Sequence, residues 1–291
     1  MEVLIKIIDK LNSKDASLSF EYFPPKEIEK EDMLFNTIST LSRYNPDFSS
    51  VTYSPKNLNL DKTLKWTIML KQKFHIESMM HLTAFTISKE DVIEVTKKLK
   101  ASKIENILAL RGDNPDNLTI KKNSFKYALS LIEFIKKIDN TFCIGCAGYP
   151  EGHIEAENFD KDLYYLNKKI EAGASFIITQ LFFINDYFYR FIDKLNKKGI
   201  NAPVICGIMP ITNLKQIIKF TKICGVTIPK ELLEKLEDKS SEEVIKIGAE
   251  YTINQCLDLI DNGFKKFHFY TLNKTNAVET ILNSLRTTLT I

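Results

Sequence analysis

The stretch LSFEYFPPK, at residues 18–26, joins a run of alternating side chains to two consecutive prolines. Successive side chains of a strand point to opposite faces, so the alternation predicts a strand over Leu18–Phe23. Proline cannot donate a ladder hydrogen bond, and Pro24 and Pro25 therefore end this strand. Glu21 is placed near the carboxyl end of the predicted strand.

Two interpretations of Glu21 follow from its neighbours. A carboxyl group flanked by Phe20, Tyr22 and Phe23 would be partly desolvated, which raises its pKa and lets it donate a proton near neutral pH. Alternatively, Glu21 lies on an edge strand and points into water. The stretch alone favours the second interpretation, because carboxyl groups with shifted pKa values at functional sites are a minority.

The composition is that of an ordinary globular protein, since 44% of the 291 residues are hydrophobic and 26% are charged. The net charge of +3 is small and the basic residues are scattered, which argues against a nucleic-acid partner. Five cysteines without a secretory signal indicate a reducing compartment, and we expect a cytoplasmic protein. No apolar run approaches the ~20 residues that span a bilayer, so no membrane partner is expected.

Strand-like and helix-like segments alternate along the chain. Eight strand ends recur at intervals of about 30 residues, the length of a βα repeat, with a longer interval before the last. The N-terminal residues 1–10 resemble a short amphipathic helix, and two extra helices, Lys230–Leu236 and Glu242–Asn262, precede the last strand. The predicted strands are Leu18–Phe23, Phe48–Thr52, Glu77–His81, Asn106–Leu110, Phe142–Ala147, Phe176–Thr179, Pro203–Ile208 and Lys266–Phe269.

This alternation predicts an α/β fold with a parallel sheet, and eight repeats predict closure into a (β/α)8 TIM barrel. A doubly wound sheet is the competing architecture. Such a sheet usually carries a G-x-G-x-x-G turn after its first strand, where this chain has LSFEYFPP. No linker or low-complexity segment interrupts the sequence, so we expect residues 1–291 to form a single barrel domain.

In such barrels the chemistry lies at the carboxyl ends of the strands. The polar groups found there suit a planar, hydrogen-bonding ligand that carries an anionic group. A hydrolytic triad is not evident, because no G-x-S-x-G elbow accompanies His81 or His153. The residues gathered by this rule are Glu21, Thr52, Tyr53, His81, Arg111, Gly112, Asp113, Tyr149, Gln180 and the segment 270–274.

Three further features have a structural interpretation. Cys143 and Cys146 form a C-x-x-C motif, but they lie in a predicted strand without a second ligand pair, which favours buried cysteines over a metal or redox site. His268 belongs to the last strand, where a structural role is at least as well supported as ligand binding. The aromatic run from Phe182 to Phe191 is more typical of core packing than of a cofactor site.

Seven motifs occur in order along the chain: FEYFPPK at 20–26, VTY at 51–53, HLT at 81–83, LRGD at 110–113, YPEGH at 149–153, ITQLFF at 178–183 and HFYTLN at 268–273. Together they resemble the methylenetetrahydrofolate reductase family, in its bacterial form with the catalytic domain only. The resemblance runs from about residue 17 to the end of the sequence. It implies that a regulatory C-terminal domain is absent, so feedback inhibition by S-adenosylmethionine is not expected.

The resemblance implies a flavoprotein oxidoreductase of one-carbon metabolism and methionine biosynthesis. Its FAD would take a hydride from NADH or NADPH and pass it to 5,10-methylenetetrahydrofolate, giving 5-methyltetrahydrofolate. By the same resemblance, Glu21 is the general acid that assists opening of the methylene bridge. Asp113 matches the aspartate that contacts the pterin and tunes the flavin, and its charge would stabilise a cationic intermediate.

The resemblance also assigns binding residues. Gln180, Gln216 and Phe220 match folate contacts, in addition to Glu21 and Asp113. Lys274 stands where the family usually has an arginine that grips the glutamate tail of the folate, and lysine lacks the bidentate fork. Tyr165 stands where a smaller polar residue is common. The residues matched to FAD are Thr52, Tyr53, His81, Arg111, Gly112, Asp113, Tyr127, Ala128, Tyr149, His153, Ala156, Asp162, Tyr165, Lys168 and Lys169.

Two other functions stay open. One is a different enzyme on the same barrel, such as a lyase or aldolase without flavin, and the other is a non-catalytic subunit that binds flavin or folate. The FAD motifs argue against the first, and Glu21 argues against the second. The sequence leaves open whether NADH, NADPH or a partner protein delivers the electrons, and we expect a homo-oligomer.

Overall fold

Eight strands form the centre of the molecule in the computed structural model, which describes residues 6–53, 59–112 and 123–289. The strands are short, and nearly all of their residues are buried, as expected where both faces of a parallel sheet are covered. Their bounds are β1 (Ser17–Tyr22), β2 (Phe48–Val51), β3 (Ser78–Thr83), β4 (Asn106–Leu110), β5 (Cys143–Gly148), β6 (Ala174–Thr179), β7 (Val204–Ile208) and β8 (Lys266–Tyr270).

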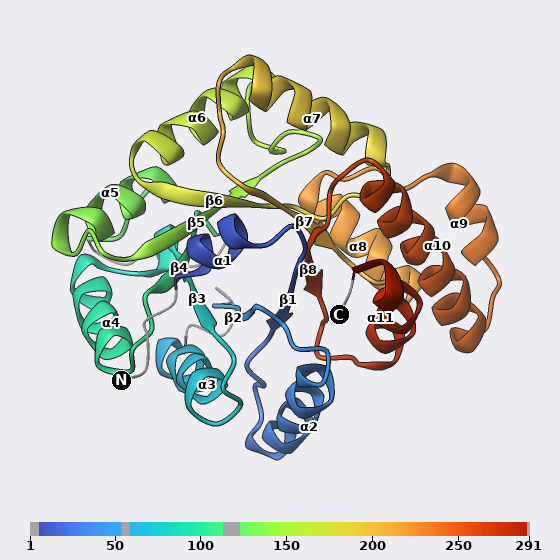
Figure 1. Ribbon diagram of the computed structural model, residues 1–291, viewed down its shortest axis with the longest axis horizontal. Coiled ribbons are helices and arrows are strands. Elements are labelled where there is room, and N and C mark those ends of the chain that lie inside the picture. Colours follow the sequence, from blue (N-terminus) through green and yellow to red (C-terminus); the bar gives the residue numbers. More distant parts are fainter. Residues whose placement is uncertain (1–5, 54–58, 113–122, 290–291) are drawn as a thin grey trace.

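The strands close into a barrel in sequence order, and all of the neighbouring pairs are parallel. Closure is made by β1, which pairs with β2 on one side and with β8 on the other. Figure 1 shows the helices arranged around this ring of strands. The predicted (β/α)8 barrel is therefore confirmed, and the competing doubly wound sheet is excluded.

The helices follow the predicted order, including the two extra helices before the last strand. Polar side chains begin several of them. Ser88 and Asp91 form a capping box at the start of α4, and Ser240 and Glu243 do the same for α10. The helices are α1 (Ile7–Ser13), α2 (Glu31–Ser42), α3 (Leu60–Gln72), α4 (Lys89–Ala101), α5 (Ala128–Ile138), α6 (Phe159–Glu171), α7 (Asn185–Lys197), α8 (Leu214–Cys224), α9 (Lys230–Leu236), α10 (Ser241–Asp261) and α11 (Asn276–Leu289).

The N-terminal helix differs from its predicted span of residues 1–10. Among the described residues, Lys6 is extended, the helix begins at Ile7 and it continues to Ser13. A tertiary contact sets this start, because the Ile7 N–H donates to Asn106 Oδ1 at the beginning of β4, 2.9 Å away. In Figure 1 the helix lies across the centre of the strand ring. It closes the end of the barrel opposite the carboxyl ends of the strands.

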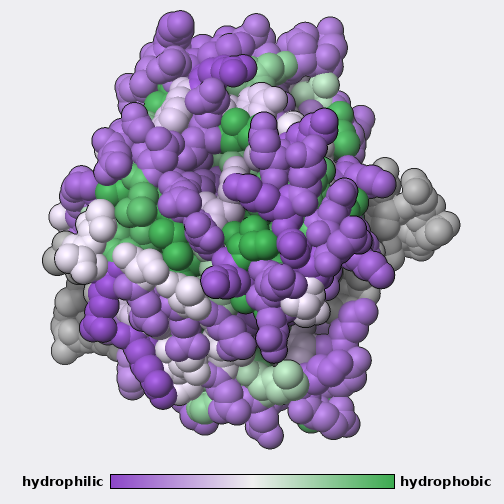
Figure 2. Space-filling model, turned by 90° about the vertical axis from the view of Figure 1, so that its right-hand side faces the viewer, coloured by the Kyte–Doolittle hydropathy of each residue, from purple (hydrophilic) through white to green (hydrophobic). Residues whose placement is uncertain are grey.

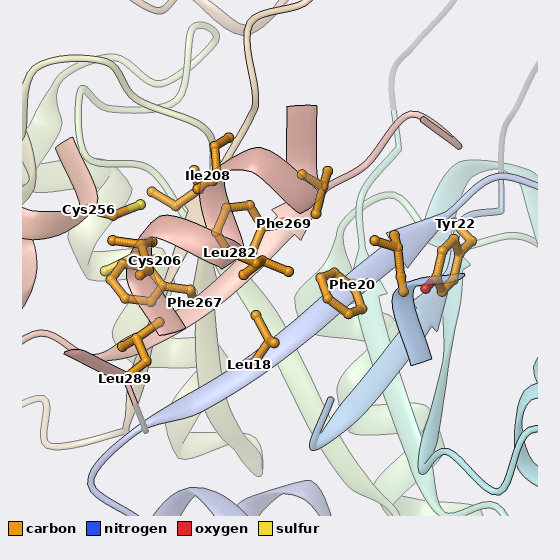
Figure 3. Close-up of a cluster of buried hydrophobic side chains, with 14 of the residues drawn as sticks. Leu18, Phe20, Tyr22, Cys206, Ile208, Cys256, Phe267, Phe269, Leu282 and Leu289 are labelled. Carbon is orange, nitrogen blue, oxygen red and sulfur yellow. The ribbon is translucent and has the colours of Figure 1, made fainter. Parts of the chain in front are cut away.

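The core has layers inside and outside the strand ring. Ile7 and Leu11 of α1 pack into the interior cluster with residues such as Phe48 and Phe176. Outside the ring, side chains of β1, β7 and β8 pack against α10 and α11, as Figure 3 shows. The aromatic run is part of this core, since Phe182, Phe183, Phe188 and Phe191 are all buried, which confirms its structural interpretation.

The two cysteines of the C-x-x-C motif lie on opposite faces of β5. Cys143 belongs to the interior cluster, whereas Cys146 packs in the layer between the strands and the outer helices. Both are buried, and burial raises the pKa of the Cys143 thiol to about 11. Side chains that point in opposite directions cannot bind one metal ion or form a disulfide, so the interpretation as buried strand cysteines is confirmed.

The surface is mostly hydrophilic on the side of the molecule that carries α9 to α11. Figure 2 shows this face, on which apolar areas are small and separated by polar side chains. Within the described ranges, no helix has both the length and the apolar character needed to cross a membrane.

Candidate active site

Glu21 faces the interior of the barrel near the carboxyl end of β1. The strand alternates, so that Leu18, Phe20 and Tyr22 point outward toward the helices, as Figure 3 shows. Ser19 and Glu21 point the other way, and Glu21 is 7% exposed. The aromatic neighbours therefore lie on the opposite face from the carboxyl group, and its burial comes from the barrel interior instead.

Three side chains surround the Glu21 carboxyl group, one from β3, one from β8 and one from the residue directly after β2. The Thr52 hydroxyl donates a hydrogen bond to Oε1 at 2.8 Å. On the other side, Oε2 lies 3.7 Å from Nε2 of His81 and 3.6 Å from Nε2 of His268. Both imidazole rings are buried. A carboxyl group between two imidazoles can exchange a proton with either of them over a short path.

The pKa of Glu21 is set by opposing effects. Burial is the largest and raises the pKa, but the charge of His81 and the bonds from His268 and Thr52 outweigh it, so the pKa lies below its usual value. The expectation of a raised pKa was wrong, because it considered desolvation without the two imidazoles. Burial lowers the pKa of His81 to about 4, so its attraction for the carboxylate acts only in acid. The hydrogen bond from Thr52 does not depend on the protonation of an imidazole, and it continues to oppose burial near neutral pH.

Ser19 and Phe48 hold the His268 ring in one orientation beside Glu21. Its Nδ1 lies 2.8 Å from the Ser19 hydroxyl, and its ring stacks on Phe48 with centroids 5.8 Å apart. Ser19 donates to the Phe267 carbonyl at 3.1 Å, so Nδ1 carries the hydrogen that Ser19 accepts. In the neutral ring, Nε2 is then an acceptor that faces Glu21, with the Ser50 hydroxyl 3.3 Å away.

The segment after β8 fastens the end of β1. The Thr271 hydroxyl donates to the Glu21 carbonyl at 2.6 Å. The Asn273 side chain accepts from the Phe23 N–H at 2.9 Å and donates to the Phe23 carbonyl at 2.7 Å. No local pattern indicates these contacts, because about 250 residues separate the partners. The position after the last strand and the HFYTLN motif marked the segment, but not what it binds.

A cavity of about 360 Å³ lies over the ends of β4 and β5. Its walls hold aromatic rings, cations and carboxylates. Nine of the residues matched to FAD come together here, although they are spread over about 60 positions of sequence. They are Arg111, Tyr127, Ala128, Tyr149, His153, Ala156, Asp162, Tyr165 and Lys169.

The cavity walls combine aromatic rings with cations and carboxylates. Tyr127 and Tyr165 are 50% and 51% exposed, an unusual amount for aromatic rings that line a hollow. Arg111 makes a bidentate ion pair with Glu155, with both N–O distances at 2.5 Å. Lys169 donates to the Ala147 carbonyl at 2.7 Å. Aromatic faces beside an arginine and a lysine suit a ligand with planar rings and phosphate groups.

Gly112, two residues beyond the end of β4, and two imidazole rings, His81 beside Glu21 and His153 in the cavity, also have features that suit a ligand at this end of the barrel. Gly112 has φ of +83°, and a Cβ at this position would lie 3.0 Å from Cβ of Thr83, so a side chain there would be strained. Both ring nitrogens of His81 are buried without a hydrogen-bond partner. His153 Nδ1 accepts from the Glu155 N–H at 3.0 Å, which places the hydrogen of the neutral ring on Nε2. The residues present therefore fit a dinucleotide such as FAD.

Not all of the residues matched to FAD line this cavity. Thr52 and His81 lie around Glu21 instead, and the buried Tyr53 lines a second cavity, of about 240 Å³, with Thr52. Lys168 points away and pairs with Glu171 at 2.6 Å. Asp113 lies outside the described residues.

The residues matched to folate lie on the segments that follow β6, β7 and β8. Gln180 directly follows β6, and its Oε1 accepts from the Leu181 N–H at 2.9 Å. Gln216 and Phe220 lie on α8, where Phe220 packs against a cluster that includes residues of the β8 end. The Lys274 ammonium group lies 3.2 Å from the Thr212 hydroxyl, which joins the segment after β8 to the segment after β7.

The parallel barrel with polar side chains at the carboxyl ends of its strands defines the class of (β/α)8-barrel proteins that carry their sites at this end. Residues 6–286 match the family model described as methylenetetrahydrofolate reductase. The chain belongs to the methylenetetrahydrofolate reductase family.

Individual relatives agree with this assignment. A 5,10-methylenetetrahydrofolate reductase from Buchnera aphidicola is 37% identical over 284 residues, which cover 96% of this chain and 95% of the relative. A methylenetetrahydrofolate reductase (NADH) 1 from Arabidopsis thaliana is 35% identical over 97% of this chain. The chain spans about half the length of the plant relatives, because the matched part covers 51% of that protein.

Solved structures share the fold. One is an uncharacterized Clostridium thermocellum protein that binds two copies of 5-methyl-5,6,7,8-tetrahydrofolic acid, with a TM-score of 0.65, 13% identity and coverage of 97% of this chain and 98% of that one. Another is a 2,3-dimethylmalate lyase, with a TM-score of 0.54, 9% identity and coverage of 97% and 85%. At these identities the likeness concerns the barrel alone.

Proposed function

We propose that this chain reduces 5,10-methylenetetrahydrofolate to 5-methyltetrahydrofolate, with FAD as cofactor and NAD(P)H as hydride donor. The observation that carries the proposal is the buried Glu21 carboxyl group, bonded to Thr52 and placed between two imidazoles. Support comes from the names of the relatives, which include reductases described with NADH and with NADPH. The lyase or aldolase alternative rests on a likeness of fold alone.

FAD would lie over the ends of β4 and β5, where Arg111, Lys169 and His153 would bind its phosphates and Tyr127 and Tyr165 would pack on its rings. When bound, FAD supplies the hydride that reduces the folate and takes up the hydride of NAD(P)H. Gly112 would let the backbone approach the cofactor closely. The unpartnered ring nitrogens of His81 would be satisfied by a ligand at the mouth.

Glu21 would supply the proton that opens the methylene bridge. Protonation of the bridge nitrogen by the carboxyl group breaks one carbon–nitrogen bond and leaves a 5-iminium ion, the form of the folate that accepts a hydride. A carboxyl group with a lowered pKa needs a nearby source of this proton. The cationic form of His268 is suited to that task, because it carries a hydrogen on Nε2 as well as on Nδ1, Nε2 lies 3.6 Å from Oε2 of Glu21, and the ring is fixed by Ser19.

The folate would be bound by the segments after β6, β7 and β8. Gln180 would donate to the pterin, Gln216 and Phe220 would contact the ligand from α8, and Lys274 would attract the glutamate tail. Asp113 is proposed for the pterin and flavin contact by resemblance alone. We further propose that residues 1–291 act as one catalytic domain in the cytoplasm, as a homo-oligomer, with NADH or NADPH as the reductant.

Binding and spectroscopy test the cofactor first. We expect the purified protein to be yellow, or to become yellow on titration with FAD, with the flavin bleached by NADH or NADPH under anaerobic conditions. Stopped-flow reduction with each nucleotide separates the two donors. A colourless protein that refuses FAD would refute the proposal.

The Glu21→Gln variant tests the role of the acid. We expect it to keep FAD and its reduction by NAD(P)H, but to oxidise the reduced flavin with 5,10-methylenetetrahydrofolate about 100- to 10,000-fold more slowly, the usual contribution of a general acid. The variant keeps the shape of the side chain and its hydrogen bond from Thr52. Unchanged folate turnover would remove Glu21 from the acid role.

A further inference from the structure

The loop after β5 contacts the far end of α8 through a carboxylate. Both oxygens of Glu151 accept a hydrogen bond from the Thr227 N–H, each at 3.1 Å. Thr227 lies three residues beyond the end of α8. Glu151 is partly buried, and this burial raises the pKa of its carboxyl group above the usual value, although the bonds from Thr227 oppose the shift. Burial of the Glu151 carboxylate therefore costs desolvation free energy, which a solvent-exposed glutamate would not lose.

An apolar contact reinforces this carboxylate bond. Gly225 ends α8 in the left-handed region, with φ of +68°. A Cβ at this position would lie 3.2 Å from Cβ of Ile154, so the Ile154 side chain, although 59% exposed, lies next to the helix end. The same loop therefore holds the end of α8 with one polar and one apolar contact.

Helix α8 contacts the core along one face only, where Leu214, Phe220 and Cys224 are partly buried against the cluster that contains Ile217. Of its 11 residues, only Ile217 and Thr221 are buried. Its N-terminal end is capped by Asn213, which accepts from the Gln216 N–H at 2.9 Å. A helix that is capped at its start and fully buries only two residues can shift at its other end, where Phe220 lies one turn from the last residue. The Glu151 contact restrains that end.

The joined elements carry different parts of the proposed site. The loop supplies Tyr149, His153 and Ala156 to the cavity proposed for FAD, whereas α8 carries Gln216 and Phe220, proposed for folate. We propose that Glu151 is a positioning residue that fixes α8 relative to the flavin loop and thereby sets the affinity for folate. This inference rests on the proposed function, and nothing in the family resemblance assigned a role to Glu151.

Binding of 5-methyltetrahydrofolate, measured by titration calorimetry on the FAD-loaded protein, tests the inference. For Glu151→Ala we expect the dissociation constant to rise about three- to tenfold, because one charge-assisted hydrogen bond no longer holds the helix. Glu151→Gln keeps an oxygen acceptor for the Thr227 N–H and should stay within about twofold of the wild type. FAD affinity should change little in either variant, because Asp162 still holds the His153 N–H at 3.2 Å.

Kinetics and amide exchange distinguish positioning from general damage. In Glu151→Ala we expect the KM for 5,10-methylenetetrahydrofolate to rise while kcat and the rate of flavin reduction by NAD(P)H remain within about twofold. Hydrogen exchange of residues 213–228 should speed up in this variant. Glu250→Ala is the matched control, because Glu250 is an exposed glutamate in the middle of α10. It should leave all of these quantities unchanged.

Several outcomes would overturn the inference. Folate affinity equal to that of the wild type in Glu151→Ala would do so, as would unchanged exchange of residues 213–228. An equal loss of FAD and folate affinity would indicate general damage instead of positioning. A wild-type protein that binds neither FAD nor folate would refute the proposed function itself. Normal binding by the wild type, together with unchanged folate affinity in Glu151→Ala, would refute only the role of Glu151.

Discussion

At the scale of single residues, the surroundings of Glu21 explain why its neighbours in sequence were a poor guide to its pKa. Phe20 and Tyr22 lie on the other face of β1, and the groups that act on the carboxyl come from β3, from β8 and from the residue directly after β2. The position of Glu21 at a strand end was predictable from alternation and proline. The two imidazoles were not, because strand pairing across about 250 residues brings His268 to Glu21.

The buried His81 predicts a pH dependence of stability. The unfolded chain binds a proton at this ring near pH 6.5, whereas the folded protein does so only near pH 4. Between these values the unfolded state binds more protons, so stability falls as the pH drops, by about 3 kcal/mol in total. The lowered pKa of Glu21 acts in the same direction. Urea unfolding at pH 7 and pH 4.5 measures the loss.

His81→Gln provides the comparison, because glutamine does not titrate. We expect its free energy of unfolding to fall much less than that of the wild type between pH 7 and pH 4.5. The same loss in both proteins would show that His81 does not cause the dependence.

We expect Lys274 to make a modest contribution to folate affinity. The lysine is exposed and lies 3.2 Å from the Thr212 hydroxyl, and exposed ion pairs are weak. Lys274→Ala should weaken folate binding about two- to fivefold with FAD content intact. Lys274→Arg should bind the glutamate tail more tightly than the wild type, because arginine offers a bidentate fork. Calorimetry with mono- and polyglutamylated folate measures both, and equal affinities would exclude Lys274 from the site.

At the scale of elements, periodicity predicted the order and type of the strands and helices, with bounds that mostly differ by one or two residues. The difference at α1 has a tertiary cause. Helix α1 starts at Ile7 because Asn106, about 100 residues away in sequence, receives that N–H, and no local pattern reports such a partner. Helix α8, in contrast, ends at a local signal, since Gly225 directly follows Cys224 and provides the left-handed end.

We expect substitutions in the core of helix α1 to lower the free energy of unfolding without affecting the candidate site. Ile7 and Leu11 fill the interior cluster at the end of the barrel opposite Glu21. Leu11→Ala should lower the free energy of unfolding by about 2–5 kcal/mol, since it leaves a cavity in a packed core. Asn12→Ala, on the exposed side of the same helix, is the control and should change it by less than about 0.5 kcal/mol. FAD affinity of the folded Leu11→Ala protein should equal that of the wild type, and a loss would connect α1 to the site.

At the scale of the whole molecule, the rate at which buried cysteines react with a thiol reagent measures how often the barrel unfolds. Cys143, Cys146, Cys206 and Cys256 are buried in three different parts of the core, and only Cys224 is partly exposed. Burial raises the pKa values of Cys143, Cys146, Cys206 and Cys256, which slows their reaction further.

A thiol reagent such as dithionitrobenzoate should therefore modify Cys224 first in the native protein and the other four at the rate of unfolding. Cys224→Ser should abolish the fast phase and leave the slow one. Fast modification of any thiol in the variant would reveal local opening of the barrel wall under native conditions. Quenched samples analysed by mass spectrometry identify the modified residues.

The hydrogen bonds from Thr271 and Asn273 hold the end of β1. During synthesis, the site around Glu21 can therefore be complete only after these residues have been made. A ribosome releases β1 early, but β8 and His268 leave the exit tunnel only after the other seven strands have been translated. Until then β1 has one unpaired edge, and Glu21 lacks His268. Nascent chains halted before residue 266 should consequently stay open to proteases and chaperones, and reactivity at Glu21 should arise in one late step when the last strand closes the ring.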